Sequence, residues 1–479
     1  MKLPKILKNS GLYSVASFLQ KGISFFLLPI YTTYLTSEDY GKLSIIQSIV
    51  SFLSIFLLLS LHASAGRLHF ISNNKYRRAR IWGTTLMLVI YNSIFLGAIF
   101  IIGHKFLIDP FAKGIQFFPL IFISLIGTIL SPVYLFFQSW LQVTQQGTRY
   151  AINMFINFIV ATTLSIVSLT VFKAGIYGLV CSALITSILF FIYSFISFFP
   201  VVKIKINKKI SIQSFKYALP ILPHSVSSWL MVMVDRLMIN NFIGSSQTGI
   251  YSVAYSFGGI LNIVTTSVNQ AFSPWFFQKV SEDRTNLSSI YSFAEIITIG
   301  YCFIAMSITL FSPEVVRLMT TKSFHTAWQP IVFISFGYVF SGLYYFLAMP
   351  LWLKNTKFVF IITLVSAGVA VILNFILIPL YGIIGSGISL LVSLCVSSII
   401  GLFLSNRMEQ DINFPWKKLY GIVTMFFSIS FFVFIIEASI ASIMLKICIK
   451  FSFFLVILSI FFYLYRNILI NFIQNRPFR

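Results

Sequence analysis

Long apolar stretches follow one another along almost the whole sequence, and short polar segments separate them. An α-helix needs about 20 mostly apolar residues to cross the hydrocarbon core of a bilayer. Because backbone groups in hydrocarbon must pair within their own segment, runs of this length predict helices and exceed barrel strands. Fourteen spans are predicted, at about residues 12–35, 42–65, 81–103, 115–143, 151–172, 176–200, 215–243, 249–277, 290–312, 327–353, 358–380, 382–404, 417–437 and 449–466.

Composition supports a chain surrounded by lipid. Hydrophobic residues make up 58% of the sequence and charged residues only 9%, which leaves too little polar surface to cover a soluble fold. The sequence therefore predicts an all-α polytopic membrane protein with about 14 transmembrane helices. Its beginning is basic but lacks an A-x-A-like cleavage site, so we expect the first span to be retained rather than removed.

The basic residues are distributed by topology rather than gathered into one patch. The net charge is +23, and with a cytoplasmic N-terminus 24 of the 34 lysine and arginine residues fall in cytoplasmic segments, 8 fall outside, and Lys21 and Arg236 lie within spans. This is a positive-inside bias, which predicts that both termini are cytoplasmic. It also removes the reason to expect a nucleic-acid partner.

Catalytic and metal-binding motifs are not recognisable. The four cysteines lie singly in or beside apolar spans, without a C-x-x-C pair, so neither a metal site nor a disulfide framework is expected. The longest loops, at about 67–80, 201–214 and 405–416, are too short for a catalytic domain. We find no paired acids and no nucleophile with its base, which disfavours a membrane-embedded polymerase, ligase or glycosyltransferase. The prediction is a protein that is not an enzyme.

Three pairs of segments repeat at nearly one spacing. YLTSEDYGKLS (34–44) aligns with FIGSSQTGIYS (242–252) at an offset of 208, TRY (148–150) with TKF (356–358) at 208, and KAGIYG (173–178) with LYGIIG (380–385) at 207. Each match is short, but all three fall at equivalent places in the order of spans.

The repeat predicts that spans 1–6 correspond to spans 7–12, in parallel orientation, with two helices appended. Parallel repeats related by an axis along the membrane normal are typical of transporters, with the substrate path between the repeats. An ancient duplication without transport is the alternative. The predicted division is an N-terminal six-helix bundle (1–200), a cytoplasmic linker (201–214), a C-terminal six-helix bundle (215–404) and two appended helices with a cytoplasmic tail (405–479).

Polar residues form stripes on the predicted spans 1, 2, 7 and 8. In span 1, Ser14, Ser17, Lys21 and Ser24 follow 3-4-3 spacing, which places them on one helix face. Further candidates for lining a cavity are Ser51, Ser228, Tyr255 and Asn262. Close helix packing through small residues is an alternative reading of the serines. Packing does not explain Lys21, which lies ~14 Å into its span at the helical rise.

Asp235 and Arg236 are adjacent charges in span 7, about five residues from its outer end. One interpretation is that Arg236 extends outward to the membrane surface. The other is that both residues face a hydrated cavity with Lys21, where Arg236 attracts an anionic head group and Asp235 moderates the field or carries a proton. Adjacent residues do not face each other on a helix, so a mutual ion pair is not expected.

Two long segments carry a resemblance to a known family. They are NSGLYSVASFLQKGISFFLLPIYTTYLTSEDYGKLS and YALPILPHSVSSWLMVMVDRLMINNFIGSSQTGIYSVAYSFGGIL, together with the 12 + 2 arrangement of spans. The chain resembles the polysaccharide flippases, the O-antigen or capsule repeat-unit translocases of the multidrug, oligosaccharidyl-lipid and polysaccharide exporter superfamily. The resemblance implies two six-helix bundles in a V, alternating access, and a cation-lined central cavity bounded by helices 1, 2, 7 and 8.

What the resemblance implies about function is correspondingly specific. The substrate would be a polyprenyl-pyrophosphate-linked oligosaccharide of the lipopolysaccharide or capsule pathway, and the location the cytoplasmic (inner) membrane. By position, Lys21 and Arg236 match the family's cavity cations, with Arg67 as a third. The resemblance implies that the protein needs no cofactor. It implies that transport is coupled to a proton or sodium gradient, and Asp235 is the candidate residue for this coupling. The implied partners, besides the lipid bilayer, are polysaccharide polymerase and chain-length machinery. A multidrug exporter of the same fold is the alternative, although cationic drugs favour an acidic cavity and the deepest charge here is Lys21.

Overall fold

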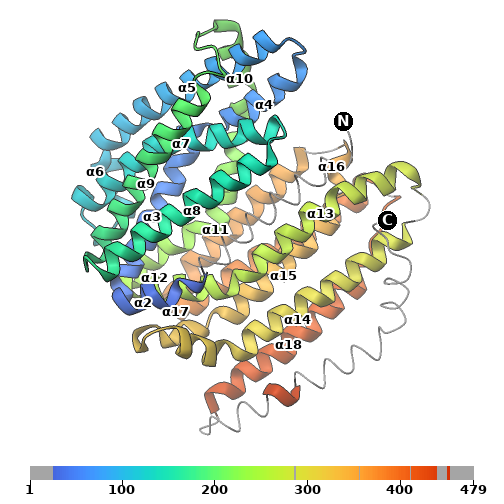
Figure 1. Cartoon of the computed structure of the whole chain (residues 1–479). Coiled ribbons are helices and arrows are strands. Elements are labelled where there is room, and N and C mark those ends of the chain that lie inside the picture. The colour runs from blue at the N-terminus through green and yellow to red at the C-terminus, as the bar shows by residue number, and fades with distance from the viewer. Residues whose placement is uncertain (1–24, 285–286, 355–356, 410, 440–449, 454–479) are drawn as a thin grey trace. The chain divides into compact units, whose positions relative to one another are not determined.

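The computed structural model describes residues 25–284, 287–354, 357–409, 411–439 and 450–453, and within them it contains helices and no strand (Figure 1). Contacts divide the chain into two compact units, residues 1–252 and 253–479, which we describe separately. The predicted all-α polytopic membrane fold is confirmed.

The first unit is built from α-helices joined by short turns and 3-10 or π segments. Its elements are α2 (Leu28–Tyr34), α3 (Ser37–Leu58), α4 (Leu61–Ile71), α5 (Lys75–Ile102), α6 (His104–Leu107), η1 (Asp109–Phe111), η2 (Phe117–Ile121), α7 (Phe122–Val143), α8 (Gly147–Thr170), α9 (Gly175–Phe198), α10 (Lys208–Ala218), η3 (Leu219–Ile221), α11 (Leu222–Ile243) and the start of α12 (Ser245–Gly258).

The second unit contains the remaining elements. They are the end of α12, then α13 (Ile260–Glu282), α14 (Ser288–Met319), η4 (Lys322–Trp328), α15 (Ile331–Leu347), α16 (Leu351–Lys354), α17 (Lys357–Met408) and α18 (Trp416–Ser439). Helix α15 is buried along most of its length and packs against α13, α14 and α17. Phe346 of α15 lies 4.8 Å from Phe272 of α13, ring centre to ring centre, so aromatic contacts bind these helices together.

Among the described residues, nine helices are long and apolar enough to cross a membrane, or ten if one bent pair counts as a single span. Helix α17 contains a break at Gly382, whose φ of 59° is a left-handed conformation that glycine adopts without strain. This break falls where the predicted spans 358–380 and 382–404 meet. The count of fourteen stays a prediction, because spans 12–35 and 449–466 lie partly outside the described residues.

Side-chain caps set the start of several helices. The hydroxyl of Thr36 accepts a hydrogen bond from the backbone N–H of Asp39 (3.1 Å) at the start of α3. The side chains of Asn74 and Asn207 do the same for α5 and α10. These oxygens satisfy N–H groups that the first turn of a helix leaves unpaired.

The predicted second span, 42–65, is broken near its C-terminal end. Helix α3 ends at Leu58 and α4 begins at Leu61, with Leu59 and Ser60 both at positive φ between them. Broken helices persist in a membrane when neighbouring groups pair with the freed backbone. Here the amide of Asn92 on α5 donates to the carbonyl oxygens of Phe56 (2.8 Å) and Leu57 (2.7 Å). The kink is therefore supported by α5.

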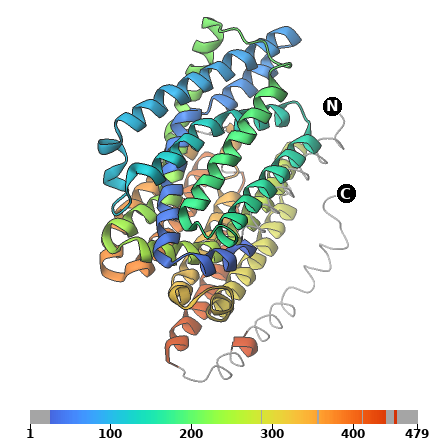
Figure 2. The same cartoon turned by 60° about the vertical axis from the view of Figure 1, so that its left-hand side comes forward.

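Helix α3 is the central helix of the first unit. It packs against α5, α7, α9 and α11, and it lies next to α7 and α9 in both views (Figures 1 and 2). Its residues Ile45, Ile49 and Leu53 are at most 5% exposed and join a core with Leu125 of α7 and Val180 of α9. These three residues are four apart in the sequence and therefore form one buried apolar face of α3.

The two aligned segments of the sequence repeat meet in the structure. A methyl group added at Gly41 would lie 1.8 Å from the carbonyl oxygen of Ser245, and one at Gly249 would lie 2.0 Å from the carbonyl oxygen of Ser37. The hydroxyls of Ser37 and Ser246 are 2.8 Å apart. Since Ser37 aligns with Ser245 and Gly41 with Gly249, the contact is reciprocal. The starts of α3 and α12 therefore cross backbone to backbone.

The predicted domain boundaries at 200 and 215 stay a prediction. Contacts divide the chain after Ser252, and α11, which the sequence repeat assigns to the second half, packs in the first unit against α3. The contact division groups residues that pack together, whereas the predicted boundaries follow the sequence repeat. The division after Ser252 therefore does not test the boundaries at 200 and 215.

The glycine crossing predicts a sharp intolerance of side chains. Gly41→Ala and Gly249→Ala should each reduce the amount of folded protein, because a β-carbon meets a backbone oxygen that cannot move aside. Size-exclusion chromatography of detergent extracts measures this. Gly300→Ala on α14 is the matched control, since nothing lies within 4 Å of its added methyl group. Parental levels of folded Gly41→Ala and Gly249→Ala protein would contradict the crossing.

Candidate functional site

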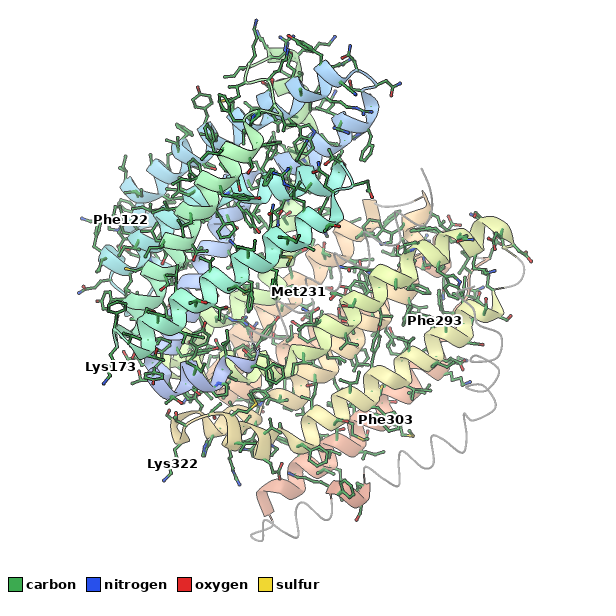
Figure 3. The ribbon with its side chains drawn as sticks, in the orientation of Figure 1. Phe122, Lys173, Met231, Phe293, Phe303 and Lys322 are labelled. Carbon is green, nitrogen blue, oxygen red and sulfur yellow. The ribbon has the colours of Figure 1, made fainter. Side chains whose placement is uncertain are left out.

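The predicted site residues fall into three groups in the structure. Lys21, Ser14, Ser17 and Ser24 lie outside the described residues. Arg67, Ser51, Ser228, Asp235 and Arg236 belong to the first unit, and Tyr255 and Asn262 to the second. Helix α11 carries three of the described candidates; Figure 3 labels its residue Met231.

Ser51 and Trp229 join α3 to α11. The indole N–H of Trp229 donates to the hydroxyl of Ser51 (2.9 Å), which itself donates to the carbonyl oxygen of Ser48 (2.8 Å). The ring of Phe52 lies 4.7 Å from that of Trp229. A polar group inside a helical bundle is costly unless paired, and here each donor has an acceptor. Ser51 thus makes the helix-packing contact that was the alternative reading, and its role in lining a path stays a prediction.

Asp235 and Arg236 form a buried ion pair. Asp235 is 4% exposed and Arg236 6%. The Nη1 of Arg236 donates to Oδ1 of Asp235 (2.8 Å) and to the carbonyl oxygen of Val232 (2.8 Å). The hydroxyl of Tyr251 on α12 donates to Oδ2 of Asp235 (2.7 Å). The guanidinium also lies 5.9 Å from the centre of the Tyr251 ring. The carboxylate is therefore held from two helices.

The expectation that these neighbours make no mutual pair is wrong. The side chains leave the helix in different directions, but the arginine side chain is long enough to turn back over its own helix and reach both Val232 and Asp235. The guanidinium of Arg236 is buried within the protein, and its place relative to the membrane surface stays a prediction. Two opposite charges that are buried together repay part of the cost of leaving water.

Arg67 is the exposed cation among the described candidates. It lies on α4, and its guanidinium carbon is 4.5 Å from the centre of the Tyr217 ring on α10. Stacking on an aromatic face orients a guanidinium while it keeps its positive charge. The structure does not bring Arg67 and Arg236 together, because one contacts α10 and the other α12. Their shared role as cavity cations stays a prediction.

The other candidates are half-buried and differ in their contacts. Ser228 lies on α11, one residue before Trp229. In the second unit, the hydroxyl of Tyr255 is hydrogen-bonded to that of Tyr338 on α15. The carbonyl oxygen of Asn262 accepts from the hydroxyl of Thr266 (2.7 Å).

Sequence reasoning missed two residues that hold this region. Tyr251 was not assigned to Asp235, although a buried acid in lipid needs donors and Tyr251 is part of the repeated segment. Asn240 of α11 was not assigned a partner either, and its amide donates to the carbonyl oxygen of Lys113 (2.8 Å) in the turn before η2. Within the described ranges, no group of three histidine, cysteine or acidic residues is placed to hold a metal ion.

The buried pair predicts strong coupling between its members. Asp235→Asn and Arg236→Gln should each destabilise the protein, and the double variant should lose less than the sum, with a coupling of about 2 kcal/mol. Equilibrium unfolding in mixed micelles measures the coupling. Glu38→Gln and Lys42→Gln provide the control, because that ion pair is exposed and should couple by about 0.5 kcal/mol or less. Additive effects at Asp235 and Arg236 would disprove the pair.

Comparison with known sequences points to one family. The family model described as polysaccharide biosynthesis protein matches residues 6–280. The chain is similar to the Lsg locus putative protein 1 of Haemophilus influenzae, with 22% identity over 298 residues that cover 60% of this chain and 70% of the relative. An uncharacterised membrane protein of the same organism is 22% identical over 323 residues, covering 64% and 74%.

Comparison with solved structures identifies the fold. The chain is similar to the lipid II flippase MurJ in an inward closed conformation, with a TM-score of 0.75 and 18% identity over 96% of this chain and 99% of that one. It is also similar to an inward-facing multidrug resistance transporter of the MATE family, with a TM-score of 0.61 and 13% identity over 80% and 93%. The chain thus has the fold of these multi-pass membrane proteins.

Proposed function

The chain belongs to the family of polysaccharide biosynthesis proteins, and we propose that it is a flippase that moves a lipid-linked oligosaccharide across the cytoplasmic membrane. The observation that carries this proposal is the combination of that family with a fold like a lipid II flippase along nearly the whole chain. The proposed substrate is a polyprenyl-pyrophosphate-linked repeat unit of an O-antigen or a capsule. Both termini are cytoplasmic in this proposal.

The chemistry of the substrate sets what the protein must supply. A pyrophosphate cannot enter hydrocarbon without a large desolvation cost, and fixed cations in a wet cavity lower that cost. The prenyl chain stays in lipid while the head group crosses. Since Asp235 neutralises Arg236 in this structure, we assign first contact with the pyrophosphate to Arg67 and Lys21.

The buried pair also suggests how an ion gradient acts. Asp235 accepts hydrogen bonds from the side chain and backbone of Arg236 and from Tyr251. A proton or sodium ion that binds the carboxylate would compete with those donors and free Arg236 for the substrate. Coupling of transport to the gradient then operates through this pair.

The proposal is a transporter and not an enzyme, and it favours an anionic substrate over cationic drugs. Four acidic residues occur in the first unit: Glu38, Asp39, Asp109 and Asp235. The first three lie in the starts of α3 and η1, and Asp235 is paired. Asp235 is the buried carboxylate among these four, and since it is paired, a cationic drug would find no unpaired buried carboxylate in the described part of this unit. Polysaccharide polymerase and chain-length machinery are the proposed partners on the outer side.

Lys21 gives the sharpest test. Lys21→Ala should abolish surface polysaccharide while lipid-linked repeat units accumulate on the cytoplasmic face, because the deepest cation is lost. Lys21→Arg should keep part of the activity, since it keeps the charge, and Lys21→Glu should be worse than alanine. Surface polysaccharide is measured by immunoblot at matched protein levels, with Lys173→Ala in the turn before α9 as the control. Normal export of polysaccharide by the Lys21→Ala variant would contradict the proposal that Lys21 binds the pyrophosphate.

Asp235 tests the coupling separately. Asp235→Asn should abolish gradient-dependent transport in proteoliposomes while binding of the lipid-linked substrate remains measurable, because the amide no longer exchanges a proton or ion. Asp109→Asn, in the turn after α6, is the matched control and should transport normally. Transport by Asp235→Asn with an unchanged rate and pH dependence would assign Asp235 a structural role alone.

A further inference from the structure

A chamber of about 340 Å³ lies inside the first unit, on the side of α3 that faces α7, α8 and α9. Ser51, which contacts α11, is not part of its wall. Most of its described polar lining consists of hydroxyl groups, and none of the described lining side chains is charged. Its lining residues are Tyr31, Tyr40, Leu43, Ser44, Ile46, Gln47, Val50, Ser124, Gly127, Thr128, Ser131, Ser165, Leu179, Val180, Ala183, Leu184 and Ser187.

Gln47 indicates that the chamber suits a polar occupant. It lies ten residues into α3, ~15 Å along the helix at the usual rise, and its side chain is exposed. Within the described part of the chain its amide has no hydrogen-bond partner. A dry amide at that depth would cost several kcal/mol, of the order of an unpaired polar group in hydrocarbon. The space beside Gln47 is therefore suited to water or to a polar ligand.

The wall is rich in hydrogen-bond acceptors. Ser44, Ser124 and Thr128 donate their hydroxyl hydrogens to carbonyl oxygens one turn back on their own helices (3.0, 2.9 and 2.7 Å). Ser131 donates to the carbonyl oxygen of Thr128 (3.1 Å). A hydroxyl that has donated its hydrogen offers only lone pairs to a ligand. The chamber thus suits a neutral molecule that brings several donors.

Charge and size narrow the ligand class. A pyrophosphate is disfavoured, because the described wall of the chamber offers many acceptor oxygens and no cation. A single metal ion is disfavoured by a space far larger than one coordination shell. The volume lies at the lower end of small-molecule sites, and apolar residues such as Leu179 and Val180 alternate with the hydroxyls. This combination matches a sugar ring, which has hydroxyl edges and C–H faces.

We propose that this chamber binds one neutral sugar residue of the lipid-linked substrate. The inference rests on the proposed function and extends it, because it places recognition of the glycan in a chamber of the first unit whose described lining does not include Arg67. The sugar hydroxyls donate to the acceptor wall, and Gln47 pairs with the sugar through its free amide. Selectivity for the repeat unit then depends on this wall.

Thiol labelling tests whether a sugar occupies the chamber. Ser187→Cys, in a chain whose native cysteines are replaced, is treated with a small methanethiosulfonate reagent in whole cells. We compare cells that make the lipid-linked repeat unit with cells that lack the transferase for its first sugar phosphate. Labelling should be several-fold lower in the cells that make the substrate. Lys173→Cys should label equally in both strains, and Ile188→Cys, on the exposed apolar face of α9, should stay unlabelled.

Each labelling outcome decides the proposal. Equal labelling of Ser187→Cys in both strains would mean that the chamber holds water alone, and no labelling in either would mean that it is not hydrated; both overturn the proposal. A matched pair gives a second readout. Ser187→Thr keeps the hydroxyl and should export normally, whereas Ser187→Val, which has the shape of the threonine variant without its hydroxyl, should lower export about fivefold for one hydrogen bond lost. Equal export by these two variants would also overturn it.

Deleting the whole chain separates this inference from the proposed function. If deletion leaves surface polysaccharide intact, the proposed function fails. If deletion abolishes the polysaccharide but Ser187→Cys labels equally in both strains, only the sugar-binding chamber fails.

Discussion

The crossing of α3 and α12 at Gly41 and Gly249 is the contact on which the arrangement of the first unit depends. It allows two backbones to touch, which brings α12 and the end of α11 against the start of α3. Tyr251 is two residues beyond Gly249, so the same contact carries its hydroxyl to Asp235. A larger residue at either glycine would separate the helices and with them the partners of the buried charge.

Electrostatics explains why the buried charges occur together. An isolated arginine or aspartate inside a membrane bundle is expensive, whereas a hydrogen-bonded pair with a third donor repays most of the cost. Arg236 and Asp235 thereby become nearly neutral as a unit, and the net positive charge of the described first unit remains on exposed residues such as Arg67. In our proposal, this pair changes its state when an ion or an anionic substrate arrives.

Helix α3 separates two environments in the first unit. Ser51 and Phe52 contact Trp229 of α11, and Gln47 and Ser44, about one and two turns away, face the hydroxyl-lined chamber. Helix α3 thus contacts both α11, the helix that bears Asp235 and Arg236, and a neutral cavity. In our proposal this division matches the substrate, whose charged pyrophosphate and neutral sugars need different surroundings.

The sequence by itself determined the helical membrane fold, because runs of apolar residues in lipid have no other way to pair their backbones. The offset of 208 also aligned Gly41 with Gly249 before their contact was known. Only the tertiary structure decided that Arg236 turns back onto Asp235, that Tyr251 joins them, and that Asn92 supports the break after Leu58. These contacts depend on side-chain conformations and on the distance between helices, and neither follows from the spacing of residues along one helix.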